Sequence, residues 1–162
     1  MKNLLLIRHA KSSWDEPNLH DSERPLNKRG LADAPVMGKR LQGRGISADL
    51  FLTSPANRAR QTAQIIAQET GYPAEAIKIQ DEIYLEGVES LFKLITNQQP
   101  TCNTLFLCGH NPDMSMLASL LVPGFLSSIP TCGIVHISFN ISSWKLIKPA
   151  GGKLLFFDSP KN

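Results

Sequence analysis

The sequence lacks a long hydrophobic run: its first apolar stretch, residues 4–7, is too short to span a membrane or to form the core of a signal peptide. It also lacks a Pro/Ser-rich linker, a low-complexity block and an internal repeat. Nothing therefore divides the chain. With 162 residues, of which 42% are hydrophobic, we expect one globular domain over 1–162 that buries a sizeable core.

Cysteine is scarce, and the three copies form no CxxC pair. In the absence of a signal peptide, we expect Cys102, Cys108 and Cys132 to be free thiols in a reducing cytoplasm, buried in the core. None of them has an adjacent base or a glycine-rich cradle. A catalytic cysteine is therefore disfavoured.

Charge of one sign is not in large excess. The net charge is +3, and the lysines and arginines are scattered along the chain instead of forming a dense stripe. Binding to duplex nucleic acid is therefore disfavoured. A small anionic ligand fits this mild positive charge better.

The chain does contain short apolar runs that alternate with segments of helical period, which predicts an α/β fold with a largely parallel sheet. Asn27 and Ser54 suit helix N-caps, and Pro35 is expected to kink the first helix or mark its restart. A fourth helix is expected to begin near Met114. The expected strands are 4–7, 49–53, 76–80 and 104–108, the third helix is 89–97, and 131–140 and 144–157 are expected to close a sheet edge as strand or hairpin.

Arginine or histidine side chains follow three of the expected strands. Arg8 and His9 follow the first strand, Arg58 lies one turn into the helix after the second, and His110 follows residues 104–108. Parallel strands gather their ligands at their carboxyl ends, so these side chains converge if the strands are neighbours. Two guanidiniums and two imidazoles repel one another without a counter-ion, and arginine forks match phosphate oxygens. The sequence thus predicts a phosphoryl-binding pocket.

These motifs resemble the histidine phosphatase superfamily with its phosphoglycerate mutase-like fold, and within it the compact SixA-type phosphohistidine phosphatases. The family's Arg-His-Gly signature appears as Arg8-His9-Ala10, with alanine as in other short SixA-like members. The second arginine appears as Arg58, and the second histidine as His110 in Gly-His-Asn-Pro. The resemblance implies three α/β/α layers around a mostly parallel central sheet.

The resemblance also implies a two-step phosphoryl transfer that needs neither a metal nor a cofactor. His9 would accept the phosphoryl group while a backbone carbonyl holds its other ring nitrogen. Arg8, Arg58 and His110 would hold the phosphoryl oxygens and stabilise the charge of the transition state. Water would then hydrolyse the phosphohistidine. The implied partner is a phosphohistidine protein or a small phosphorylated molecule, with no role for nucleic acid or a membrane.

The proton donor to the leaving group stays open at this point. Larger members of the family use a carboxylate after the second arginine, and here Glu82 matches that position better than Glu86. An imidazole leaving group can be protonated near neutral pH, whereas an alkoxide needs a delivered proton. A poorly defined acid thus favours protein phosphohistidine as the substrate. A general phosphomonoesterase or mutase-like enzyme and a non-catalytic phosphate-binding module are the alternatives.

Overall fold

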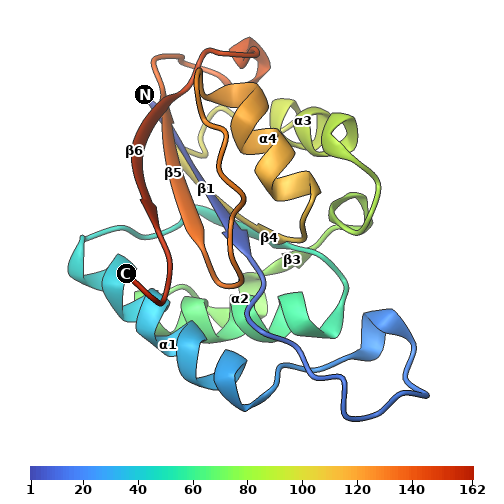
Figure 1. Ribbon diagram of the computed structural model, residues 1–162. Helices are drawn as coiled ribbons and strands as arrows, with labels where there is room; N and C mark the ends of the chain where they lie inside the picture. The colour runs from blue at the N-terminus through green and yellow to red at the C-terminus, as the bar shows by residue number, and fades with distance from the viewer.

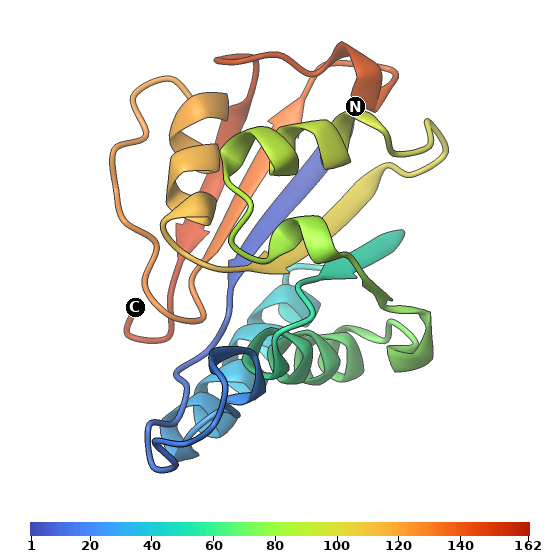
Figure 2. The same cartoon turned by 90° about the vertical axis from the view of Figure 1, so that its right-hand side faces the viewer.

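The computed structural model describes residues 1–162 as a central sheet covered by helices on both faces (Figure 1). Figure 2 shows α3 and α4 on one side of the sheet and α1 and α2 on the other, which confirms the three-layer prediction. No helix is long and apolar enough to cross a membrane. The strands are β1 (Lys2–Arg8), β2 (Leu50–Thr53), β3 (Lys78–Ile79), β4 (Thr104–Gly109), β5 (Ile134–Phe139) and β6 (Lys153–Asp158), and the helices are α1 (Lys28–Gly43), α2 (Asn57–Thr70), α3 (Val88–Thr96) and α4 (Asp113–Leu121).

The sheet has the strand order β3-β2-β4-β1-β5-β6. β1 pairs in parallel with β4, which in turn pairs in parallel with β2, while β5 is antiparallel to both β1 and β6. Only β5 therefore runs against the other strands, so the mostly parallel sheet is confirmed. Strands from both ends of the chain share this sheet.

The first strand shows why its apolar run is continuous. Leu4 and Leu6 pack into the core under α3 and α4, whereas Leu5 and Ile7 pack into the core under α1 and α2. Successive side chains of a strand point to opposite faces, and both faces of this sheet are covered. The run 4–7 therefore has no solvent-facing position.

The first helix begins as expected but does not restart. The Asn27 side chain caps α1 by accepting a hydrogen bond from the Gly30 backbone N–H at 2.9 Å. Pro35 lies inside α1, so a restart there is wrong. Proline costs about 3 kcal/mol inside a helix, yet the residues on both sides of it, Ala34 and Met37, are buried in the same core. That packing keeps the two halves in one helix.

Two other boundaries differ from the prediction. α2 begins at Asn57 with Ala56 as its N-cap, so the start predicted at Ser54 is wrong. The Ser54 hydroxyl instead accepts a hydrogen bond from the Ala56 N–H at 3.1 Å and closes a turn before the helix. Trp144 is also not in a strand. It lies in a 3-10 helix, fully buried, and its indole N–H donates to the Cys102 carbonyl at 2.7 Å.

Candidate active site

The predicted site residues lie at the carboxyl ends of neighbouring strands. Arg8 is paired with Gly109 in the β1–β4 ladder, so His9 and His110 follow adjacent strand ends. Their ring centroids are 5.1 Å apart. On the other side of β4, β2 leads into α2, whose first turn carries Arg58. The three strand ends identified in the sequence are therefore neighbours.

His9 is held with one ring nitrogen free. Its Nδ1 lies 2.7 Å from the carbonyl oxygen of Ala10, and because a carbonyl only accepts, Nδ1 donates. The backbone of His9 is fixed as well: its N–H donates to Gly109, and its carbonyl accepts from Cys132, both at 3.0 Å. This tautomer leaves the lone pair on Nε2, which has no partner in the protein. His9 can thus attack a phosphorus atom through Nε2.

Both active-site histidines are neutral at neutral pH. Burial, reinforced by the charges of Arg58 and Arg8 and opposed by the hydrogen bond with Ala10, lowers the pKa of His9 to about 4. Burial, the neighbouring His9 and Arg58 lower the pKa of His110 to about 3. A neutral imidazole is the nucleophilic form. His9 therefore needs no separate base to become reactive.

Two buried nitrogen atoms of the site, one on Arg8 and one on His110, have no hydrogen-bond partner in the protein. The Arg8 Nη1 group donates to the Ile129 carbonyl at 2.8 Å, but the Arg8 Nε has no partner. The His110 Nε2 lies 2.7 Å from the Ser54 hydroxyl, and its Nδ1 has no partner. An unsatisfied buried polar group costs about 1–3 kcal/mol. Oxygen atoms of a bound phosphoryl group would accept from the Arg8 Nε–H. They would also accept from the His110 Nδ1 in the tautomer in which Nδ1 carries the proton and Nε2 accepts from the Ser54 hydroxyl.

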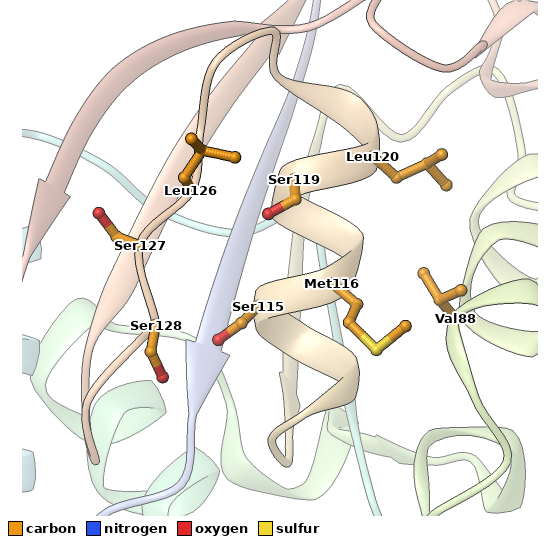
Figure 3. A pocket seen from close by; sticks show the side chains of 8 residues that line it. All are labelled: Val88, Ser115, Met116, Ser119, Leu120, Leu126, Ser127 and Ser128. Carbon is orange, nitrogen blue, oxygen red and sulfur yellow. The ribbon is translucent and has the colours of Figure 1, made fainter.

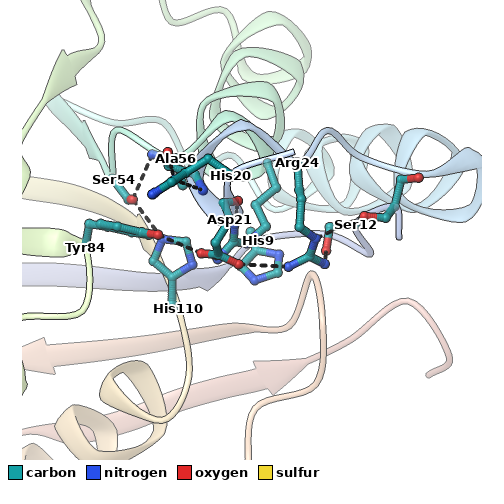
Figure 4. A network of polar contacts seen from close by, with 12 residues as sticks. His9, Ser12, His20, Asp21, Arg24, Ser54, Ala56, Tyr84 and His110 are labelled. Carbon is teal, nitrogen blue, oxygen red and sulfur yellow. Dashed lines mark hydrogen bonds and ion pairs between the residues drawn. The ribbon is translucent and has the colours of Figure 1, made fainter. Parts of the chain in front are cut away.

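Arg58 is held by an acidic residue that the sequence did not single out. Its two terminal nitrogens donate to the Asp21 carbonyl at 2.8 Å and to the Asp21 Oδ2 at 3.0 Å. The Asp21 carboxylate also accepts from the Tyr84 hydroxyl at 2.6 Å and from Arg24 at 3.0 Å (Figure 4). Partial burial alone would raise the pKa of Asp21, but hydrogen bonds from Tyr84 and Arg58 and the Arg58 charge lower it to about 2. Asp21 is therefore ionised.

A threonine joins α2 to the loop that follows β1. The Thr62 hydroxyl donates to the Arg58 carbonyl at 2.8 Å and accepts from the Ala10 N–H at 3.0 Å. Ala10 is fully buried and has no positive φ, so alanine is compatible with this backbone where the family has glycine. Asp21, Ser54, Thr62 and Tyr84 were not predicted as site residues from the sequence. The one available signal was the Asp-x-x-Arg spacing of Asp21 and Arg24.

The two predicted proton donors lie outside this network. Glu82 is in the 3-10 helix Asp81–Ile83, half-buried, and makes no hydrogen bond or ion pair. Glu86 is exposed and also makes none. Between them, Tyr84 reaches the site and packs edge-on against the His110 ring, with centroids 5.4 Å apart.

The remaining candidate residues lie elsewhere. The three cysteines are free and buried, and burial raises the pKa of Cys102 to about 11 and that of Cys132 to about 12. His20 is exposed, and His136 on β5 pairs with the Asn3 side chain at 2.9 Å. No group of three or more His, Cys, Asp or Glu side chains is placed to hold a metal ion.

A cavity of about 510 Å³ lies away from the histidines, between α4 and the segment 126–128 (Figure 3). Its lining contains no charged side chain and no histidine, and Figure 3 shows Met116, Leu120 and Val88 on one side of it. It has no group that could transfer or bind a phosphoryl dianion. The candidate active site is therefore the polar cluster at the strand ends.

Comparison with known proteins identifies relatives with several functions. A family model described as the histidine phosphatase superfamily (branch 1) matches residues 4–121. A chloroplast protein of Arabidopsis thaliana without an assigned activity is 33% identical over 165 residues, which cover 94% of this chain and 75% of that protein. A phosphoglycerate mutase of Schizosaccharomyces pombe is 37% identical over 95 residues, which cover 56% of this chain and 45% of the mutase. The crystal structure of a candidate phosphohistidine phosphatase SixA from Agrobacterium tumefaciens matches with a TM-score of 0.84 at 28% identity, covering 98% of each chain.

Proposed function

The chain belongs to the histidine phosphatase superfamily, which with its SixA-like neighbours supports a phosphatase, and we propose that it hydrolyses protein phosphohistidine through a phosphoryl intermediate on His9. The observation that carries the proposal is the environment of His9. Its ring is neutral, its Nδ1 is held by Ala10, and its free Nε2 lies among cations. This arrangement suits a nucleophile and has no use in a site that only binds phosphate.

In the first step, the His9 Nε2 lone pair attacks phosphorus and the bond from phosphorus to the leaving nitrogen breaks. The leaving imidazole keeps that electron pair and takes up a proton. Arg8, Arg58 and His110 bind the phosphoryl oxygens, whose charge they stabilise in the transition state. In the second step, water attacks the phosphorus of phospho-His9, which releases phosphate and restores the imidazole. Neither step needs a metal or a cofactor in this proposal.

Two observations favour phosphohistidine over an alkyl phosphate ester. Glu82, the predicted proton donor, makes no hydrogen bond or ion pair with the site residues, and an imidazole leaving group depends less on a delivered proton than an alkoxide does. The SixA-type structure also matches this chain along its whole length, with a TM-score of 0.84. A small phosphomonoester is the second candidate substrate. A cytoplasmic location stays a prediction.

Trapping of the intermediate tests the proposal. We expect brief incubation with a ³²P-labelled phosphohistidine protein, followed by an alkaline detergent quench, to leave an alkali-stable and acid-labile label on the wild-type protein. His9→Asn should carry no label. His136→Asn, which changes a buried histidine away from the site, should be labelled like the wild type. No label with any phosphodonor and no phosphate release would favour the non-catalytic binding module.

A substrate panel tests the narrower part of the proposal. Rates with a phosphohistidine protein, p-nitrophenyl phosphate and small phosphate esters should differ by more than about tenfold in kcat/KM, which is roughly 1.4 kcal/mol of barrier. A smaller preference for phosphohistidine would contradict that substrate assignment and leave the phosphatase activity intact.

A further inference from the structure

Asp21 occupies an unusual place for an acid in a site that binds an anion. Its carboxylate and carbonyl together take both terminal nitrogens of Arg58, and the carboxylate also binds Arg24 and Tyr84. Arg58 is one of the groups proposed to hold the phosphoryl oxygens. An acid that only weakened this clamp would be harmful, so its position calls for a functional reason.

Asp21 also lies at the mouth of the site. Its side chain is 45% exposed, compared with 7% for Arg58 and 9% for Arg24. In an in-line transfer to the His9 Nε2, the leaving group lies on the side of phosphorus opposite to the nucleophile. The proposed nucleophile, His9, lies at the buried end of β1, so the group that carries the phosphoryl must lie toward the mouth of the site. The negative charge of Asp21 lies there as well.

We propose that Asp21 determines specificity by charge: its carboxylate disfavours phosphorylated molecules with a second anionic group near the phosphoryl group and favours a neutral or cationic carrier. This inference rests on the proposed function and narrows its substrate class. An imidazole carrier fits, since it is neutral in the substrate and becomes a cation when its second ring nitrogen is protonated. A carboxylate or second phosphate beside the phosphoryl group would instead face Asp21 as a like charge.

The charge balance of the site supports this inference. His9 and His110 are neutral, so the positive charge that acts on His9 comes from Arg8, Arg58 and Arg24. Asp21 cancels one of these three charges. The remaining charge of about +2 matches a single phosphoryl dianion and leaves no surplus to attract a second anionic group. Without Asp21, the same arginines would accept a more highly charged ligand.

A matched pair of ligands tests the inference without turnover. Glycerol 3-phosphate and 3-phosphoglycerate are both alkyl phosphates. The other end of the molecule is a neutral alcohol in glycerol 3-phosphate and a carboxylate in 3-phosphoglycerate. By calorimetry at low salt, the wild type should bind glycerol 3-phosphate about tenfold more tightly. Asp21→Asn, which keeps an acceptor oxygen for the arginines, should reduce that ratio to about twofold or less. The exposed acid two residues away provides the control, and Glu23→Gln should keep the tenfold ratio.

An unchanged ratio in Asp21→Asn, or an equal fall in Glu23→Gln, would overturn the inference. If Asp21→Asn does not fold, the salt dependence of the wild type decides. Screening of Asp21 should make the ratio fall as salt rises, whereas a site that attracts the second anion would make it rise. Hydrolysis of phosphohistidine by the wild type is measured separately. Failure of the proposed function then appears in turnover, and failure of this inference appears only in the binding ratio.

Discussion

The active site has two sides, which differ in whether their hydrogen-bond donors already have partners in the protein. On one side, Arg8 and His110 each keep a buried nitrogen without a hydrogen-bond partner. On the other side, Arg58 is already bound by Asp21 at two points. The first side is therefore ready to receive oxygen atoms, while the second must share its charge between a ligand and an internal carboxylate.

The difference shows that counting cations at a site does not give its affinity for an anion. An unpaired donor that is fixed by its surroundings gains a full hydrogen bond when the ligand arrives, with no reorganisation. A donor that is already paired gains less, but its position is fixed in advance by its partner. The two sides should therefore respond differently when one member is changed.

The largest effects are expected from loss of either guanidinium. Arg8→Met and Arg58→Met should each lower kcat/KM by about 10³-fold, or roughly 4 kcal/mol of transition-state stabilisation, because each removes a donor to the phosphoryl oxygens. Steady-state kinetics with a phosphohistidine protein measures both. If kcat/KM fell by less than about tenfold in either variant, that arginine would not be one of the groups that hold the phosphoryl oxygens.

Two double variants test whether Asp21 acts only on the side of the site that contains Arg58. In Arg58→Met, the Asp21 carboxylate is left facing the phosphoryl group with only Arg24 as its counter-charge. Adding Asp21→Asn should therefore recover about tenfold in kcat/KM. The same change added to Arg8→Met should give no such recovery, because Arg8 makes no contact with Asp21. Equal recovery in both would show that the two sides are not distinct.

The pH dependence of stability should also distinguish the two sides. Because the pKa of His9 is about 4 and that of His110 about 3 when folded, the unfolded chain binds protons near pH 6.5 that the folded chain does not. The free energy of unfolding should thus fall as the pH drops below about 6.5, by up to about 1.4 kcal/mol per pH unit for each histidine. Asp21, whose pKa in the folded state is lowered to about 2, should lose its contribution to stability only at lower pH, as the pH falls below the ordinary aspartate pKa of 3.8.

Urea unfolding at a series of pH values measures these slopes. His110→Asn should reduce the slope between pH 6.5 and about 4, since it removes one of the groups that take up protons on unfolding. Asp21→Asn should leave the slope in that range unchanged. Burial also lowers the pKa of His136 on β5, so His136→Asn gives the slope due to a histidine outside the site. Stability that rose as the pH fell from 6.5 would contradict the neutral state of both active-site histidines.

The sequence predicted Arg8, His9, Arg58 and His110 but not the residues that hold them in place. Arg8, His9 and His110 were predictable because each follows an apolar run of strand length, and strand ends of a parallel sheet converge. Asp21 and Tyr84 come from irregular segments with no periodicity, so no pattern placed them beside Arg58. Ser54 was assigned to a helix cap because its type suits one. Only the fold shows that its hydroxyl lies beside His110 instead.

The smallest effect is expected at Glu82, and it tests whether the site needs a proton donor outside its two sides. Glu82→Gln should change kcat/KM for a phosphohistidine protein by less than about threefold, because the side chain makes no hydrogen bond or ion pair with either side of the site and the imidazole leaving group can take its proton near neutral pH. Glu86→Gln, on the exposed position nearby, is the matched control. Loss of all activity on phosphohistidine in Glu82→Gln alone would make Glu82 the general acid. In that case the substrate argument from a weak acid would fail, and a phosphomonoester would become the better candidate.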